Sequence, residues 1–176
     1  IALAGTGVGK SLFMCHVASS FLTQGLNVLY ITLEMSEERI AERIDANLFD
    51  VSMDDLRTMP KDLYDNKLTK LEDKTKGRLI IKEYPTAAAH SGHFKSLLNE
   101  LALKKSFKPQ VIFIDYLNIC ASSRFKGGNI SSYFYVKAIA EELRGLAVEF
   151  DVPIFSATQT TRTGFVSTDI GLEDTA

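Results

Sequence analysis

The chain lacks a strong charge of either sign, and it contains no long apolar run. Its 176 residues hold 20 Lys and Arg against 22 Asp and Glu, which gives a formal net charge of −2. This balance offers no overall electrostatic attraction for nucleic acid, so any nucleic-acid site must be local and built on loops. No apolar stretch approaches the ~20 residues that a membrane-spanning helix needs, which excludes such a helix from this sequence.

Cysteine is also scarce. Cys15 and Cys120 are the only two, and each lies in an apolar stretch without metal-ligand spacing. This pattern predicts buried free thiols in a reducing compartment. Since no signal peptide is recognisable either, we expect a cytoplasmic protein.

The chain does contain apolar, β-rich runs that alternate with helical patterns. Strands are predicted for "IALAG", "VLYITL", "RLIIKEY", "QVIFIDYL" and "VPIFSATQ", and helices for residues 11–22, 36–47, 92–105 and 133–150. Residues 53–76 are charged and amphipathic, and predict two short helices broken near Pro60. Because most strands are apolar throughout, they indicate an α/β fold with a mostly parallel sheet and helices on both faces. We predict one domain over residues 1–176.

The segment "IALAGTGVGKS" carries the clearest chemical signal. It fits the phosphate-loop pattern, with Ala4 in place of the first glycine, and it lies between a predicted strand and a predicted helix. Its glycines let backbone N–H groups point at a β-phosphate, Lys10 can reach the β- and γ-phosphates, and Ser11 offers a hydroxyl to Mg²⁺. The predicted nucleotide-binding residues are Ala4, Gly5, Thr6, Gly7, Val8, Gly9, Lys10, Ser11 and Leu12.

Two further apolar strands end on polar side chains. Residues 111–114 are followed by Asp115, and "FSATQTTR" contains Gln159. In phosphate-loop enzymes, an acid at the end of the strand next to the loop holds Mg²⁺, and a glutamine can sense the γ-phosphate. Taken alone, an apolar strand that ends in Asp is common and often forms a cap or a turn.

Glu34 ends the run "VLYITL" in the same way. Ligands of such sheets lie at the carboxyl ends of the strands, so Glu34, Asp115 and Gln159 should meet at the edge from which the phosphate loop departs. Glu34 is then a candidate general base, or the group that positions the attacking water. The alternative is a cap for the following helix, although Ser36 fills that role more conventionally.

The phosphate loop, "ITLEMSEERIAERI", "VIFIDYLNI" and "FSATQTTR" together resemble the C-terminal motor domain of DnaB-type replicative helicases, above all those of T4-like bacteriophages. The resemblance covers essentially the whole chain. "LEM" is its most specific part, because RecA-type recombinases usually place other residues there. The resemblance implies a RecA-like phosphate-loop ATPase with ATP, or another NTP, and Mg²⁺. The implied catalytic residues are Lys10, Glu34 and Gln159, and the implied metal residues are Ser11 and Asp115. Arg162 takes the arginine position of the "Q-x-x-R" pattern.

The resemblance also implies an assembly. Members form a ring of six subunits around single-stranded DNA, bind ATP between neighbours and move 5′–3′. They usually work with a primase and a helicase loader, in the host cytoplasm if viral, and not at a membrane. The sequence starts inside a strand and stops in mid-pattern, so we interpret it as a fragment. An amino-terminal domain would precede Ile1, and a segment with the arginine finger would follow Ala176.

Two loops are candidates for DNA contact. "CASSRFKGGNISSYFY" holds Arg124 and Lys126 with several aromatic residues and no acid, and "TTRTGFVST" holds Arg162. Lys, Arg, Ser and backbone N–H groups bind nucleic-acid phosphates without regard to sequence. The alternative is an ordinary surface loop with two charges.

Three functions fit the sequence. The first is a helicase motor driven by NTP hydrolysis. The second is a RecA- or KaiC-like ATPase for recombination or regulation, which "LEM" disfavours. The third is a scaffold that binds ATP without hydrolysing it, which the presence of Glu34, Asp115 and Gln159 together disfavours.

Overall fold

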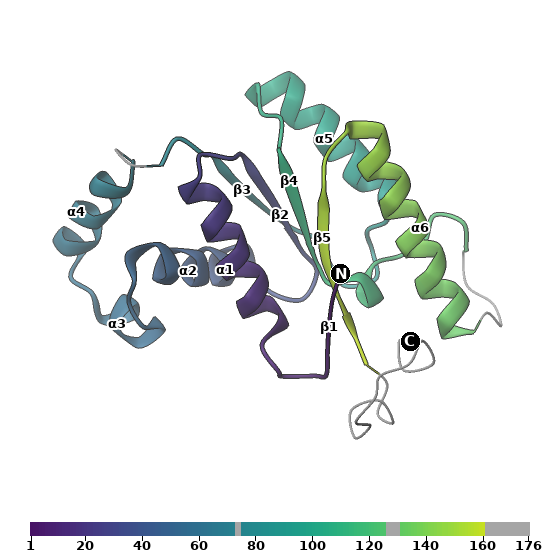
Figure 1. The fold of residues 1–176 in the computed structure, drawn as a ribbon, viewed down its shortest axis with the longest axis horizontal. Helices are drawn as coiled ribbons and strands as arrows, with labels where there is room; N and C mark the ends of the chain where they lie inside the picture. The colour runs from purple at the N-terminus through teal and green to yellow at the C-terminus, as the bar shows by residue number, and fades with distance from the viewer. Residues whose placement is uncertain (73–74, 126–130, 161–176) are drawn as a thin grey trace.

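The protein is seen in a computed structural model that describes residues 1–72, 75–125 and 131–160. Its strands and helices alternate along the chain as the sequence predicts (Figure 1). The strands are β1 (Ala2–Ala4), β2 (Val28–Thr32), β3 (Leu79–Glu83), β4 (Val111–Asp115) and β5 (Ile154–Gln159). The helices are α1 (Lys10–Thr23), α2 (Glu37–Phe49), α3 (Met53–Thr58), α4 (Lys61–Glu72), α5 (Ser91–Lys105) and α6 (Ser132–Phe150).

The five strands form one sheet in the order β1-β5-β4-β2-β3, and each pair of neighbours is parallel. The carboxyl ends of the strands therefore lie along one edge, at the bottom of Figure 1. The register aligns Thr32 with Asp115, and Ala4 with Gln159. The ends of β2, β4 and β5 and the start of the phosphate loop thus meet, as predicted.

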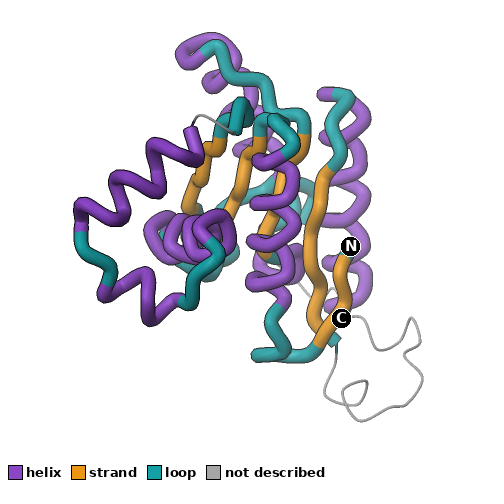
Figure 2. The backbone as a smooth tube through the Cα atoms, turned by 60° about the vertical axis from the view of Figure 1, so that its left-hand side comes forward, coloured by secondary structure: helices purple, strands orange, loops and turns teal. Residues whose placement is uncertain are grey.

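Helices cover both faces of the sheet, which confirms the predicted α/β class (Figures 1 and 2). On one face, α1 and α2 pack over residues such as Val28 and Phe113. On the other face, α5 and α6 pack over residues such as Leu29 and Ile112. Strands β2 and β4 are buried along their full length, because they lie in the middle of the sheet between these two cores.

Helices α3 and α4 form a small cluster beside α2, with Phe49 and Leu56 at its centre. They are the two short helices predicted on either side of Pro60. Among the described residues, no helix combines the length and apolar character that crossing a bilayer requires. Cys15 and Cys120 are buried free thiols, as predicted.

One predicted strand is too long. The segment "QVIFIDYL" leaves the sheet after Asp115, and Leu117–Ile119 form a short 3-10 helix, η1. Asn118 explains the turn, since its Oδ1 accepts hydrogen bonds from the Thr158 hydroxyl at 2.9 Å and from the Gln159 N–H at 3.1 Å. Buried polar groups at the end of β5 are thereby satisfied, which a longer β4 would prevent.

Candidate active site

The phosphate loop joins β1 to α1. Gly7 and Gly9 have φ angles of 73° and 97°, in the left-handed region that side chains other than glycine rarely adopt. Gly9 is also the N-cap of α1, and it offers no side-chain hydrogen bond to the first turn. The N–H groups of that turn are therefore open to an anion, which the positive end of the helix dipole also attracts.

Lys10 is held by the loop itself. Its Nζ donates to the carbonyl oxygens of Gly5 at 2.7 Å and Ala4 at 3.2 Å, and it lies 5.6 Å from the ring centroid of Tyr116. The ammonium group thus stays at the loop without a phosphate. Its flexible stem allows it to turn to phosphate oxygens when a nucleotide enters.

A pocket of about 250 Å³, here called the nucleotide pocket, opens beside this loop. Eight predicted residues line it: Thr6, Gly7, Gly9, Lys10, Ser11, Leu12, Glu34 and Gln159. Met35, Arg43 and Tyr116 complete the lining, whereas Ala4, Gly5, Val8 and Asp115 are not part of it. A larger pocket of about 470 Å³ adjoins it and shares Leu12 and Arg43.

Glu34 lies at the rim of this pocket with an exposed side chain. The buried Thr32 hydroxyl fixes the turn around it, because it donates to the Met35 carbonyl at 2.8 Å and accepts from the Met35 N–H at 3.1 Å. The Leu33 N–H also donates to the Asp115 carbonyl at 3.0 Å. Ser36 caps α2 through the Arg39 N–H, so the helix does not use Glu34 as its cap.

Asp115 lies behind the pocket and is fully buried. Its Oδ2 accepts a hydrogen bond from the Tyr30 hydroxyl at 3.0 Å, while its Oδ1 has no hydrogen-bond partner among the described residues. A buried carboxylate with one unpaired oxygen is unfavourable unless a cation offsets its charge. Together with the Ser11 hydroxyl, this oxygen-rich donor set fits Mg²⁺.

Gln159 connects the end of β5 to the phosphate loop. Its Nε2 donates to the Thr6 hydroxyl, and its backbone N–H is fixed by Asn118. A ligand that moves the loop can therefore move the end of β5. This connection is what a γ-phosphate sensor needs.

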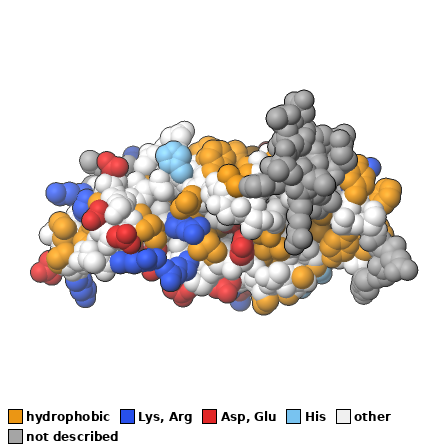
Figure 3. Space-filling model, turned by 90° about the horizontal axis from the view of Figure 1, so that it is seen from below, with side chains coloured by type: hydrophobic (Ala, Val, Ile, Leu, Met, Phe, Trp, Pro, Cys, Tyr) orange, Lys and Arg blue, Asp and Glu red, His pale blue; other side chains and the backbone are white. Residues whose placement is uncertain are grey.

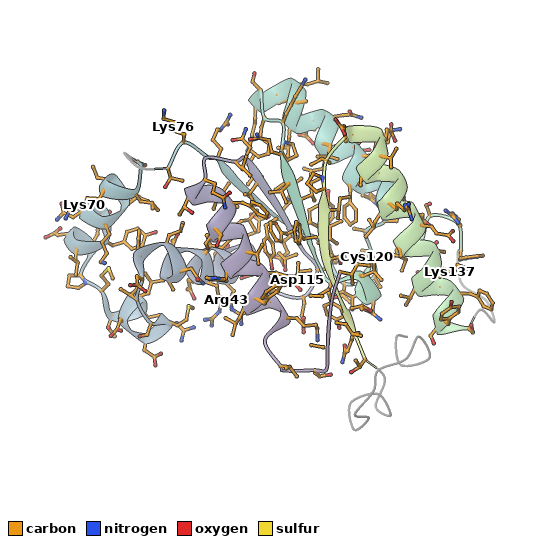
Figure 4. The ribbon with its side chains drawn as sticks, viewed as in Figure 1. Arg43, Lys70, Lys76, Asp115, Cys120 and Lys137 are labelled. Carbon is orange, nitrogen blue, oxygen red and sulfur yellow. The ribbon has the colours of Figure 1, made fainter. Side chains whose placement is uncertain are left out.

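Sequence reasoning missed Arg43, Tyr116 and Tyr30. Arg43 and Tyr116 line the nucleotide pocket, and Arg43 comes from α2, across α1 from Asp115 (Figure 4). The weak signal for Arg43 is its place two turns into the helix that follows Glu34. Tyr30 could have been found from its spacing, since it lies on the face of β2 that meets Phe113 and Asp115 on β4.

The DNA-binding prediction is only partly described by the structure. Arg124 is exposed, and its guanidinium pairs with the Glu141 carboxylate at 2.7 Å. Lys126 and Arg162 lie outside the described residues. On the carboxyl edge, Lys and Arg mix with Asp and Glu on the side of α2, α3 and α4 and do not gather into one basic patch (Figure 3).

Comparison with known proteins yields one family. A family model described as the DnaB-like helicase C-terminal domain matches residues 1–167. A DnaB-like replicative helicase of Enterobacteria phage T4 is 48% identical over 179 residues, which cover all of this chain and 38% of that protein. A probable plasmid replicative DNA helicase of Chlamydia trachomatis is 32% identical, over 92% of this chain and 35% of its own length. The chain therefore spans less than half the length of these relatives.

Two solved structures share the fold. One is a DnaB-like replicative helicase studied with its interactions with primase, with a TM-score of 0.72 over 96% of this chain and 40% of the other. The second is the ATPase domain of another protein, with a TM-score of 0.73 over 96% of this chain and 59% of the other. Both are 19% identical to this chain, so they support the predicted RecA-like ATPase fold and no more.

Proposed function

The chain belongs to the family of DnaB-like helicase C-terminal domains, and on this basis we propose that it is the ATPase motor of a replicative DNA helicase. The observation that carries this proposal is the meeting of the phosphate loop, Glu34 and Gln159 around one pocket at the carboxyl edge of the sheet. A scaffold that only binds ATP has no use for a carboxylate at that place.

In the proposed reaction, the nucleotide phosphates lie against the loop and the first turn of α1. Lys10 leaves the Ala4 and Gly5 carbonyls and contacts the phosphates as a point charge. Glu34 orients the attacking water and takes its proton. Ser11 and Asp115 would hold Mg²⁺, which offsets the charge that develops on the phosphates.

Gln159 would report the state of the γ-phosphate. Its hydrogen bond to Thr6 links it to the loop, and its backbone is fixed to η1 through Asn118. Loss of the γ-phosphate would thus be transmitted to the segments that follow β4 and β5. These segments hold the candidate DNA-binding residues Arg124, Lys126 and Arg162.

We propose further that the motor works as a ring of six subunits on single-stranded DNA, with 5′–3′ movement and a primase and helicase loader as partners. The likeness to the T4 and chlamydial helicases supports this view. Basic residues of a neighbouring subunit would complete each ATP site. An arginine finger typically contributes ~10³–10⁵ in rate, so rapid hydrolysis is expected only from the assembled ring.

Strand displacement by the complete protein tests this function. A forked duplex with a 5′ single-stranded tail should be unwound in the presence of ATP and Mg²⁺, while a duplex with only a 3′ tail should not. The variant Lys10→Ala serves as the inactive control. ATP hydrolysis without any strand displacement would instead favour the RecA- or KaiC-like regulatory ATPase, with which the internal pairing of Arg124 is compatible.

A further inference from the structure

A tyrosine hydroxyl lies in the core directly behind the nucleotide pocket. Tyr30 is in the middle of β2 and is fully buried. Its hydroxyl donates to Oδ2 of Asp115 at 3.0 Å, and the Cys15 thiol lies 3.8 Å away as a weak donor to it. Cys15 is one helical turn after Ser11 on α1, so this short chain of contacts runs from the phosphate-loop helix to Asp115.

The position of the hydroxyl is fixed by packing. Tyr30 is opposite Phe113 in the sheet, and the two rings stack with centroids 5.6 Å apart and planes 9° apart. Phe113 in turn stacks on Phe155 at 5.3 Å. A ring held in this way cannot swing, so its hydroxyl has one place to donate.

The consequence for Asp115 is an asymmetry between its two oxygens. Oδ2 is occupied by Tyr30, whereas Oδ1 lacks a partner within the described part of the chain. Without the hydroxyl, the carboxylate could turn about its own bond and present either oxygen. With it, one oxygen and one orientation are selected before any metal arrives.

We propose that Tyr30 is a positioning residue for the metal site: its hydrogen bond to Oδ2 presents Oδ1 of Asp115 to the Mg²⁺ of the bound nucleotide. This inference rests on the proposed function, because it takes Asp115 as a metal residue. A neutral donor suits the task, since it orients the carboxylate without cancelling its charge. Hydrogen bonds behind a metal ligand typically matter by ~10–100-fold in metal affinity.

The variant Tyr30→Phe in the complete protein tests the inference. It keeps the ring and its stacking on Phe113 and removes only the hydroxyl. ADP affinity is measured by calorimetry once with Mg²⁺ and once with EDTA, and the ratio gives the contribution of the metal. We expect this ratio to fall by ~10-fold or more in Tyr30→Phe, with the affinity in EDTA unchanged.

Matched controls separate positioning from stability. Tyr64→Phe removes a second tyrosine hydroxyl that donates to a carboxylate, Oδ2 of Asp45 at 2.8 Å, in the cluster of α3 and α4 away from the pocket. It should leave the metal ratio unchanged. Cys15→Ala should also leave it unchanged, because the thiol contacts Tyr30 and not Asp115.

A second route does not depend on how well the single variant folds. In an Asp115→Asn background the buried side chain is neutral, so loss of the Tyr30 hydroxyl is better tolerated. If Tyr30 acts through Asp115, adding Tyr30→Phe to this background should not change the metal ratio further. A further decrease would show that Tyr30 acts by another path and would overturn the inference.

The outcomes distinguish the two levels of the proposal. Wild-type protein whose ADP affinity does not depend on Mg²⁺ would contradict the proposed function itself. A metal-dependent wild type with an equal ratio in Tyr30→Phe would overturn only the inference. Equal loss of affinity with Mg²⁺ and with EDTA would make Tyr30 a structural residue and would overturn it as well.

Discussion

At the scale of single residues, the site depends on how Glu34 is held at the end of β2. The Thr32 hydroxyl closes the turn from both sides, and the Leu33 N–H ties it to the end of β4. The backbone is thus rigid where the side chain is exposed. This arrangement suits a group that must meet a water molecule in one place.

Replacement of this carboxylate tests its role. Glu34→Gln should retain Mg·ADP affinity and lower ATP turnover of the assembled enzyme by at least the ~10²–10⁴ typical of a general base. The control is Glu38→Gln, an exposed acid in the first turn of α2 that does not line the nucleotide pocket. Turnover that is unchanged in Glu34→Gln would remove Glu34 from catalysis.

Much of this residue-scale arrangement could be predicted from the sequence. The phosphate loop, Glu34 and Gln159 were found because polar residues that end apolar strands are conspicuous, and they do line one pocket. The burial of Asp115 and its bond to Tyr30 could not be predicted, because strand order decides which strand lies beside β4. Arg43 was missed because its role depends on how α2 packs against α1.

At the scale of elements, α6 fixes the segment that leads to the first candidate DNA loop. The Glu142 carboxylate accepts hydrogen bonds from the hydroxyls of Ser91 at 2.8 Å and Ser122 at 2.6 Å, and from the N–H and hydroxyl of Ser123. Glu141, its neighbour, pairs with Arg124. One turn of α6 thus holds the chain on both sides of Ser123.

These bonds make the stability of this element depend on pH. Partial burial raises the pKa of Glu142, but the hydrogen bonds from Ser122, Ser123 and Ser91 outweigh it and lower the pKa from its ordinary 4.5 to about 2. Because the folded state favours the ionised form, the stabilisation is complete above pH 4.5 and is lost as the pH falls toward 2.

Glu142→Gln should therefore reduce the free energy of unfolding at pH 7 by about 1–3 kcal/mol, the usual range for hydrogen bonds to a charged group. It should also weaken the loss of stability between pH 4.5 and 2. Urea denaturation at several pH values measures both effects. As a control at pH 7, Glu141→Gln removes only an exposed ion pair and should cost less than about 1 kcal/mol. Equal effects of the two variants would contradict this explanation.

The ion pair of Arg124 leads to a prediction about DNA. In the structure, Glu141 competes with any phosphate for the guanidinium. Glu141→Gln should therefore tighten binding of single-stranded DNA at low salt, to a similar degree for all sequences. Fluorescence anisotropy with labelled oligonucleotides measures this change. Unchanged affinity would remove Arg124 from the DNA path.

The converse change tests the loop as a whole. Arg124→Ala together with Lys126→Ala should weaken single-stranded DNA binding for all sequences and flatten its dependence on salt, since fewer phosphate contacts release fewer ions. Glu141→Gln in the same double variant should then have no further effect. A salt dependence equal to that of the wild type would exclude this loop from the interface.

At the scale of the whole molecule, the parallel sheet was predictable, but the order of its strands was not. Continuous apolar runs such as "VIFI" require cover on both faces, and β2 and β4 are buried along their full length. The order β1-β5-β4-β2-β3 depends on which helix crosses which face, information that is spread over the whole chain. The same order brings β1 beside β5, and so joins Gln159 to the phosphate loop.

This topology supports the central claim, that nucleotide hydrolysis and a grip on DNA are coupled. The nucleotide pocket and the segments after β4 and β5 lie at the same edge of the sheet. The measurement that tests the coupling most directly is steady-state ATP hydrolysis by the complete protein with and without single-stranded DNA. The account predicts strong stimulation by DNA that is lost in Glu34→Gln. Hydrolysis at the same rate with and without DNA would contradict it.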